Sequence, residues 1–254
     1  MTSFNQLYAQ YYDLLYKDKD YQQESNYIHY LIQKYYGNAQ SILELGCGTG
    51  KHAQLLATKG YDILGVDSSE HMINIAKKSQ SGNKCSIRFL TGDIRELYLN
   101  EKFDVVLSLF HVMSYQITNS DIEKAFATAT RHLKPNGMFI FDFWYGPAVL
   151  TEKPETRVKR IQNNELKVTR IAESILDVNR NIVDVNYEIF LKKAEEVHTM
   201  KELHKMRYFF MPEVEKLLIE QQLLLEHAFI FLTEQKPTVN SWNVCVVARK
   251  EGEE

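Results

Sequence analysis

The chain has 254 residues, enough for one large domain and too many for a small fold held together by disulfides. Its composition, 44% hydrophobic and 25% charged with 11 Gly and 5 Pro, is that of a globular protein and excludes collagen-like and disordered classes. A formal net charge of -3 gives no overall field that attracts nucleic acid or an anionic membrane, so we expect neither partner. The three Cys lie far apart without metal-ligand spacing, and we predict neither a disulfide nor a metal site.

The N-terminal region is rich in tyrosine and lacks the pattern of a signal peptide. Nine of the 15 Tyr fall in the first 36 residues. No cationic start precedes an apolar stretch there, and no run approaches the roughly 18 apolar residues that span a bilayer, so we expect a cytoplasmic protein. Helical spacing of apolar residues predicts a helix over 24–36, ended by Gly37. We expect Tyr27, Tyr35 and Tyr36 to pack from this helix onto the core.

From residue 42 to residue 143 the chain alternates between short apolar runs and amphipathic stretches. The predicted strands are 42–45, 63–66, 87–90, 103–110 and 138–143. Helices are predicted between them, through Leu56, over 69–78 and over 120–133. Fully apolar strands alternating with amphipathic helices are typical of a parallel sheet covered on both faces.

The pattern changes after Pro147. Val183, Val185 and Tyr187 fall on one face of a period-two alternation that follows a turn at 179–181, which predicts antiparallel hairpins over about 154–210. The α/β pattern then resumes with a helix at 212–222 and strands at 223–232 and 244–248. We therefore predict an antiparallel insertion within an α/β domain.

The run ILELGCGTGKH at 42–52 predicts a strand, a turn with three alternate glycines, and the start of a helix. Glycines permit left-handed backbone and let a ligand approach the main chain without a Cβ in the way. Ligands of open parallel sheets bind at the carboxyl ends of the strands, and Asp67 ends the next strand, where a carboxylate can hold the two hydroxyls of a ribose. A tight turn whose glycines serve packing alone is the alternative interpretation.

The position of the glycines separates two classes of nucleotide ligand. A dinucleotide fold carries Gly-x-Gly-x-x-Gly, and Lys51 stands where its third Gly falls. The pattern from Glu44 to Gly50 is instead Glu-x-Gly-x-Gly-x-Gly. An acidic residue before the glycines suits a cationic amine better than a pyrophosphate. The ligand implied has a ribose, an amine and no phosphate, as S-adenosylmethionine does.

The sequence resembles the class I S-adenosylmethionine-dependent methyltransferases. The motifs that carry the resemblance are, in order, ILELGCGTGKH, GVDSSEHMINIAK, FLTGDIREL, FDVVLSLFHVMSYQ and HLKPNGMFIFDFW. The family implies an α/β fold, a doubly wound, seven-stranded, mostly parallel sheet whose last strand is antiparallel, here with an inserted antiparallel β subdomain. It also implies S-adenosylmethionine as cofactor and S-adenosylhomocysteine as product. The parts expected are an N-terminal aromatic lid and helix (1–40), a cofactor-binding domain (41–150 and 211–254) and a β insertion that binds the acceptor (151–210).

The resemblance implies the cofactor-binding residues. Glu44 is expected to hold the methionine amine, Asp67 the ribose hydroxyls and Asp93 the adenine amine. The full set comprises Tyr8, Tyr16, Glu44, Gly46, Cys47, Gly48, Gly50, His52, Asp67, Ser68, Met72, Asp93, Ile94, Leu109 and Phe110.

A second resemblance is to the sugar N-methyltransferases that act on nucleotide-linked amino sugars. It rests on YAQYYDLLYKDKDY, the His of GKH, the aromatic end of the strand at 142–144 and the insertion. It implies a lid containing Tyr8, Tyr12 and Tyr16 and a small, nucleotide-linked acceptor. Tyr115 stands where those enzymes carry His. Small clostridial-type methyltransferases of unassigned substrate share this layout.

Methyl transfer from a sulfonium is an in-line displacement that depends on positioning and on the exclusion of water. The catalytic residues expected are His111, Tyr115 and Tyr12, with a surface or core role as the alternative for each single His, including His52 and His204. Basic residues are dense over 153–170, and Arg suits bidentate phosphate binding. The acceptor-binding residues expected are Trp144, Arg157, Arg160 and Arg207, and a solvated hairpin face is the alternative for the basic ones.

We therefore predict a methyltransferase for a small acceptor, with the amine of a nucleotide-linked amino sugar favoured. A small-molecule O-methyltransferase, which would depend more strongly on a base, is the nearest alternative. A catalytically inactive cofactor-binding protein is the non-enzymatic one. A homodimer is compatible with the sequence.

Overall fold

The computed structural model describes residues 14–80, 86–163, 166–194 and 196–252. The strands of its central sheet are β1 (Ser41–Leu45), β2 (Asp62–Asp67), β3 (Ile87–Thr91), β4 (Phe103–Ser108), β5 (Leu133–Tyr145), β10 (Leu223–Ile230) and β11 (Asn243–Lys250). They lie in the order β3-β2-β1-β4-β5-β11-β10, and β11 is antiparallel to both of its neighbours. The doubly wound, mostly parallel sheet of seven strands is thus confirmed.

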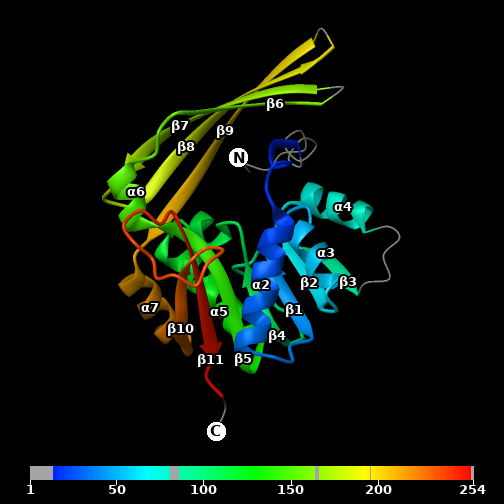
Figure 1. The fold of residues 1–254 in the computed structure, drawn as a ribbon, viewed down its shortest axis with the longest axis vertical. Helices are drawn as coiled ribbons and strands as arrows, with labels where there is room; N and C mark the ends of the chain where they lie inside the picture. The colour runs from blue at the N-terminus through cyan, green and yellow to red at the C-terminus, as the bar shows by residue number, and fades with distance from the viewer. Residues whose placement is uncertain (1–13, 81–85, 164–165, 195, 253–254) are drawn as a thin grey trace.

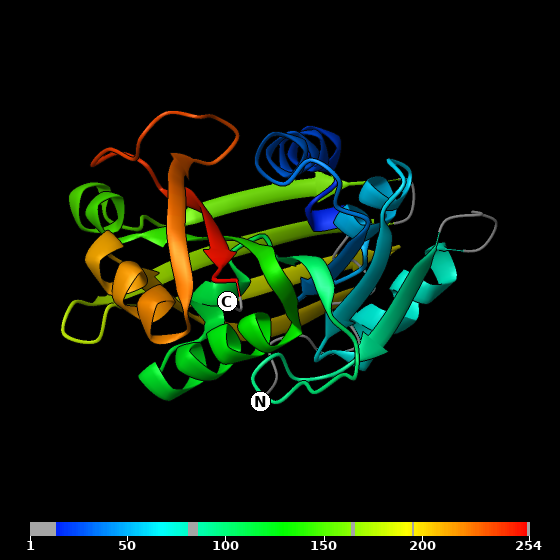
Figure 2. The same ribbon diagram turned by 90° about the horizontal axis from the view of Figure 1, so that it is seen from below.

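Helices cover both faces of this sheet, as Figure 2 shows for α2 and α5. The helices are α2 (Tyr21–Tyr35), α3 (Lys51–Ala57), α4 (Glu70–Ser79), α5 (Asn119–His132), α6 (Gly146–Glu152) and α7 (Met211–Glu220), with the 3₁₀ turn η1 (Val112–Tyr115). Successive strand residues point to opposite faces, so Ile42 packs with α2 and α3 whereas Leu43 and Leu45 pack with α5 and α7. Tyr27, Tyr35 and Tyr36 pack against the first of these two cores, as expected.

A second, antiparallel sheet lies above the central one in Figure 1. Its strands, in consecutive order, are β6 (Arg157–Gln162), β7 (Leu166–Asp177), β8 (Ile182–Lys193) and β9 (Glu196–Phe209). Val183, Ile189 and Leu191 are buried on one face of β8, which confirms the period-two interpretation. This sheet joins the central one where β9 runs parallel to the end of β5, at Trp144↔Tyr208 and Tyr145↔Phe209.

Three local features differ from the sequence prediction. The apolar run expected to be a strand through Phe110 ends at Ser108, because Phe110 and His111 both take left-handed backbone with φ near 64°. β5 starts at Leu133, before the strand expected at 138–143, with an irregular register beside Phe103 and Val105. The short helix α6, which links β5 to the insertion, was not predicted. Within the described ranges no helix is long and apolar enough to cross a bilayer.

Candidate active site

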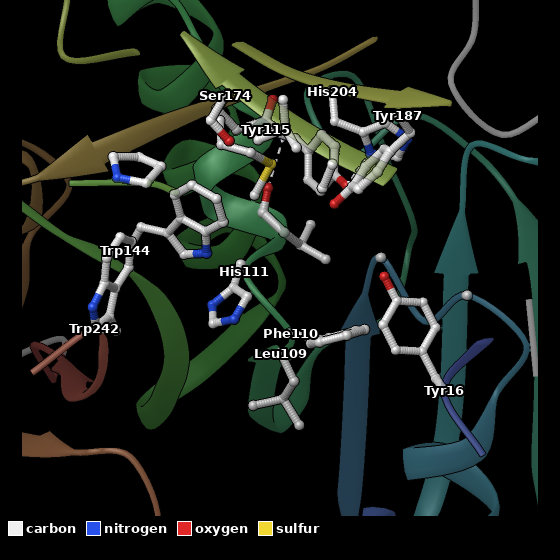
Figure 3. Close-up of a pocket in the computed structure, with 18 of the residues that line it drawn as sticks. Tyr16, Leu109, Phe110, His111, Tyr115, Trp144, Ser174, Tyr187, His204 and Trp242 are labelled. Atoms are coloured by element: carbon white, nitrogen blue, oxygen red, sulfur yellow. Dashed lines mark hydrogen bonds between the residues drawn. The ribbon is translucent and has the colours of Figure 1, made fainter. Parts of the chain in front are cut away.

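A cavity of about 1010 Å³ separates the carboxyl ends of the central strands from the inserted sheet. Figure 3 shows the aromatic side chains that gather around it. The lining residues from the central domain include Gly46, Gly48, Asp67, Ser68, Met72, Asp93, Ile94, Leu109 and Phe110. All nine of these were expected to bind the cofactor. The cavity thus follows the strand ends that the motifs mark.

The Asp67 carboxylate at the end of β2 accepts hydrogen bonds from two main-chain amides, one of which belongs to the turn after β1. The Gly48 amide donates to Asp67 Oδ2 at 2.9 Å, and the Ser69 amide donates to Asp67 Oδ1 at 2.8 Å. Burial raises the pKa of Asp67, and these two hydrogen bonds oppose that rise. At Gly46, with φ of 79°, a Cβ would lie 2.5 Å from the Val112 side chain. Glycine is therefore required where this turn passes η1.

Four residues expected to bind the cofactor lie outside the lining of the cavity. Glu44, Cys47 and His52 are buried behind the glycine turn, and a Cβ on Gly50 would meet Phe89 at 2.6 Å. Cys47 and Gly50 lie in the turn, whereas Glu44 belongs to β1 and His52 to α3. Spacing alone could not separate the positions that line the cavity from those that lie behind them.

His52 joins two carboxylates instead of facing the cavity. Its Nε2 lies 2.7 Å from Glu24 Oε2 on α2, and its Nδ1 lies 3.7 Å from Glu44 Oε1. Burial raises the pKa of Glu44 to about 7, with Asp67 adding to the rise and His52 opposing it. Glu44 Oε2 is buried and has no hydrogen-bond partner among the described residues. An acceptor atom in this state suits the cationic amine that the motif implies.

The part of the cavity expected to hold the adenosine has charged residues, Asp93 and Arg95, on one side and apolar residues, Ile94 and Met72, on the other. The Asp93 carboxylate accepts from Arg95 Nε at 2.9 Å, and this hydrogen bond is the main cause of its lowered pKa. Ile94 and Met72 are buried, and both border the cavity. Arg95 also lines the cavity and was not expected there, because nothing in the sequence distinguishes it from a surface residue.

The left-handed pair at the end of β4 turns the chain toward the cavity. The His111 amide donates to Asp142 Oδ1 at 2.9 Å, and His111 Nδ1 lies 3.2 Å from Asp142 Oδ2. Burial raises the pKa of Asp142, but the neighbouring His111 and the hydrogen bonds around it outweigh burial and leave it lowered. Asp142 therefore holds the loop that carries Phe110 and His111.

Tyr16 connects the N-terminal segment to both sides of the cavity. Its ring meets Phe110 edge-on, with ring centroids 5.1 Å apart, and its hydroxyl accepts from Arg170 Nη1 at 3.3 Å. Tyr8 and Tyr12, the other expected lid residues, lie outside the described residues.

The inserted sheet supplies a basic and aromatic wall. Arg157, Lys159, Arg170 and Tyr187 line the cavity, together with Trp144, whose ring meets Trp242 edge-on at 5.9 Å. Figure 3 shows the two Trp side by side.

Two of the expected acceptor-binding arginines lie elsewhere. Arg160 is exposed and does not line the cavity. Arg207 is buried, donates to Asn119 Oδ1 at 2.8 Å and pairs with Glu213, so it joins β9 to the starts of α5 and α7. Both placements have one cause, since a count of charge along the chain does not reveal which partner each side chain meets.

Tyr115 lines the cavity as expected, and it meets His204, one of the single histidines for which a surface or core role was the alternative. Its hydroxyl lies 2.8 Å from His204 Nδ1, and His204 Nε2 lies 3.2 Å from Glu202 Oε2. The signal available was the alternation of β9, which puts Glu202, His204 and Met206 on one face. Among the described residues no group of His, Cys, Asp and Glu could hold a metal ion.

Comparison with known proteins adds a decisive observation. A family described as "Methyltransferase domain" matches residues 42–137, the stretch that carries the glycine turn, Asp67, Asp93 and β4. Residues 42–137 form a methyltransferase domain. Relatives that match most of the chain are also methyltransferases, so the protein is a methyltransferase, as predicted.

The methyltransferase has relatives over most of its length. It is 26% identical over 208 residues to a dTDP-3-amino-3,4,6-trideoxy-alpha-D-glucopyranose N,N-dimethyltransferase of Streptomyces venezuelae, which covers 79% of this chain and 86% of that protein. The crystal structure of an S-adenosylmethionine-dependent methyltransferase from Clostridium acetobutylicum superposes with a TM-score of 0.84 at 24% identity, over 99% of this chain and 100% of that one. A sugar N-methyltransferase from Streptoalloteichus superposes with a TM-score of 0.81 at 19% identity, over 94% and 92%.

Proposed function

We propose that the enzyme methylates the amino group of a nucleotide-linked amino sugar. The observation that carries this proposal is the basic and aromatic wall opposite the cofactor side of the cavity. Arg157, Lys159 and Arg170 line that wall, and a guanidinium binds phosphate oxygens in a fixed bidentate geometry. The cavity, about 1010 Å³, is large enough for a cofactor and a second ligand. The named activity of the Streptomyces venezuelae relative supports the same class of acceptor.

The residues that would hold S-adenosylmethionine are those of the β1 and β2 ends. Glu44 would accept from the amine, and Asp67, already held by two main-chain amides, would accept from the ribose hydroxyls. The cofactor supplies a methyl carbon on a sulfonium, so that an N–C bond forms as the C–S bond breaks and its electron pair stays on sulfur. Phe110 and Tyr16 would exclude water from the space around the transferred methyl group and would orient the acceptor there.

A panel of nucleotide-linked sugars tests the acceptor. The full-length enzyme is incubated with S-adenosylmethionine and matched pairs of sugars that differ in bearing an amine or a hydroxyl at one carbon. We expect S-adenosylhomocysteine and a product that carries one or two methyl groups on nitrogen. Calorimetric binding of S-adenosylhomocysteine is measured separately, so that a failure of cofactor binding is distinguished from a wrong acceptor. Methylation of the hydroxyl partner instead of the amine contradicts the proposal.

The basic wall can be tested with a matched pair of arginines on β6. Both arginines are exposed, but Arg157→Ala removes a cation that lines the cavity, whereas Arg160→Ala removes one that does not. We expect Arg157→Ala to raise the acceptor KM about tenfold, the loss of one charged hydrogen bond, without changing S-adenosylhomocysteine affinity. Arg160→Ala should leave both unchanged. If the two substitutions raised the acceptor KM equally, the effect would come from the overall charge of the insertion and not from a phosphate-binding site at the cavity.

A small-molecule O-methyltransferase is the second candidate, and the His111–Asp142 pair favours it. Nδ1 of His111 lies 3.2 Å from Asp142 Oδ2 beside the cavity, an arrangement able to stabilise a protonated imidazole. A hydroxyl acceptor requires such a base, so His111→Gln would then lower kcat by about 10²-fold or more. With an amine acceptor we expect a loss of less than about tenfold.

A further inference from the structure

A chain of polar side chains leads from the cavity into the inserted sheet. Tyr115 OH lies 2.8 Å from His204 Nδ1, and His204 Nε2 lies 3.2 Å from Glu202 Oε2. Tyr115 and His204 line the cavity, whereas Glu202 lies behind them and is 8% exposed. Tyr115 comes from η1 and the other two from β9, so folding brings together groups that are 89 residues apart. Figure 3 shows Tyr115 and His204 meeting at the cavity wall.

The partners fix the direction of both hydrogen bonds. The Glu202 carboxylate only accepts, so Nε2 of His204 carries the proton and donates it. Nδ1 is then an acceptor, and the Tyr115 hydroxyl donates to it. Burial, followed by the neighbouring Tyr16, Tyr187 and Glu202, raises the pKa of Tyr115 well above its usual value against the effect of Arg170, which keeps the phenol a neutral donor.

Aromatic and cationic side chains of β7 and β8 pack near the His204 imidazole, in addition to its hydrogen bonds with Tyr115 and Glu202. The ring of Tyr187 on β8 meets it edge-on at 4.8 Å, and the Arg170 guanidinium on β7 lies 4.7 Å from the centre of the Tyr187 ring. Glu202 Oε1 is buried and has no hydrogen-bond partner among the described residues. A buried carboxylate oxygen in this state costs stability. The same face of β9 continues with the buried Met206, so an apolar residue at 204 would also fit the packing.

We propose that Tyr115, His204 and Glu202 form a relay that takes up the proton released by the acceptor amine, a role that rests on the amine methylation proposed above. The nitrogen loses its proton to the Tyr115 oxygen as the hydroxyl proton of Tyr115 passes to His204 Nδ1. His204 becomes an imidazolium paired with Glu202, and Tyr115 remains a neutral phenol. The relay resets when the imidazolium returns its proton to water. Glu202 contacts no reacting atom and acts as a positioning residue.

Kinetics of two substitutions test the relay. With saturating substrates we expect Tyr115→Phe to lower kcat about 10²-fold, because the path of the proton is cut, while S-adenosylhomocysteine affinity is retained. We expect Glu202→Gln to lower kcat about tenfold and to move the acid limb of the kcat–pH profile to lower pH. The sign follows because active enzyme needs neutral His204, and loss of the carboxylate destabilises the imidazolium.

His198→Gln and Glu196→Gln are the matched controls. Both residues lie on β9 and are exposed outside the cavity, so kcat and the pH profile should stay those of the wild type. Values for Tyr115→Phe and Glu202→Gln within about twofold of wild type, with an unmoved acid limb, would overturn the proposal.

Nuclear magnetic resonance of isotope-labelled histidine tests the relay without an acceptor. In the wild type we expect His204 to carry its proton on Nε2, and in Glu202→Gln we expect its titration to move to lower pH. An unchanged His204 titration in that variant overturns the relay whatever the acceptor. If His204 shifts as expected but no amine in the panel is methylated, the proposed function and the relay's role in it fail, while the coupling of His204 to Glu202 is confirmed.

Discussion

Glu44 is a buried carboxyl group that we propose holds the amine of the cofactor. Its pKa is raised to about 7, first by burial and then by Asp67, so near neutral pH the carboxyl group is partly protonated. A cationic amine binds the carboxylate form only, and each pH unit below this pKa weakens such binding about tenfold. Binding should therefore release a proton where the free enzyme still holds one.

We expect the affinity for S-adenosylhomocysteine to fall about tenfold between about pH 8 and about pH 6, as Glu44 takes up its proton. Calorimetry across this range measures the affinity, and buffers of different ionisation enthalpy report the released proton. Glu44→Gln should bind more weakly and lose this dependence on pH. Equal affinities at the two pH values in the wild type would show that Glu44 does not bind the amine.

At this scale the sequence predicted well which residues line the cavity, and it predicted less well which residues lie behind them. Gly46, Gly48 and Asp67 were predictable because a strand end, a glycine and a carboxylate each have a local signature. His52 and Arg207 were expected to contact ligands, and in the structure they pair with Glu24 and Glu213. Partners brought together by folding leave no mark in the local pattern.

Asp104, at the start of β4, joins several elements at the amino-terminal ends of the central strands, away from the cavity. Its carboxylate accepts from Gln40 N at 3.0 Å, Ser41 N at 2.9 Å, Ser41 Oγ at 2.8 Å, Lys134 Nζ at 2.8 Å and Tyr36 OH at 3.1 Å. Burial raises the pKa of Asp104, but Lys134 and the donors of Gln40 and Ser41 outweigh it and hold the pKa well below its usual range. The end of α2, β1, β4 and β5 are thereby joined.

We expect Asp104→Asn to lower the free energy of unfolding by about 3 kcal/mol at neutral pH, because it leaves buried donors and Lys134 without their carboxylate. The folded pKa lies below that of the unfolded chain, so this contribution is full at neutral pH and is lost as the pH falls below about 4. Urea unfolding at several pH values measures the difference. Asp62→Asn, an exposed carboxylate on β2, is the control. Equal losses in the two variants would contradict this role.

At the scale of secondary-structure elements, the periodicity of apolar residues predicted the strands and the long helices, but it did not predict where β4 ends. Ser108 ends the strand although Leu109 and Phe110 continue the apolar run, because Phe110 and His111 turn with positive φ. Non-glycine residues in that conformation cost about 1–3 kcal/mol and persist where the surroundings hold them, as Asp142 does here. Apolar periodicity carries no information about such a turn.

At the scale of the whole molecule, one side of the cavity belongs to the central sheet and the other to the inserted sheet. We therefore expect S-adenosylhomocysteine and the acceptor to protect different segments from amide hydrogen exchange. S-adenosylhomocysteine should slow amide hydrogen exchange in 46–50, which is the glycine turn, and in 67–72, which begins with Asp67. A nucleotide-linked amino sugar should slow exchange in 157–159 and 170–174, the parts of β6 and β7 that line the cavity. Mass spectrometry of peptides measures both effects. Protection of the same segments by both ligands would contradict the division.

The narrow junction between the sheets has a consequence for how enzymes of this kind diversify. The inserted sheet continues the central one through two residue pairs, Trp144↔Tyr208 and Tyr145↔Phe209, whereas the glycine turn, Asp67 and Asp93 belong wholly to the central domain. Sequence drift at the cavity-facing positions of β6 and β7 can therefore reshape the proposed acceptor wall, whereas Val168, Ile189 and Leu191 pack against Met72 and are constrained by it. In a directed-evolution library, substitutions confined to the cavity-facing residues Arg157, Val158, Ala172 and Ser174 should change which acceptors are methylated while variants keep cofactor affinity.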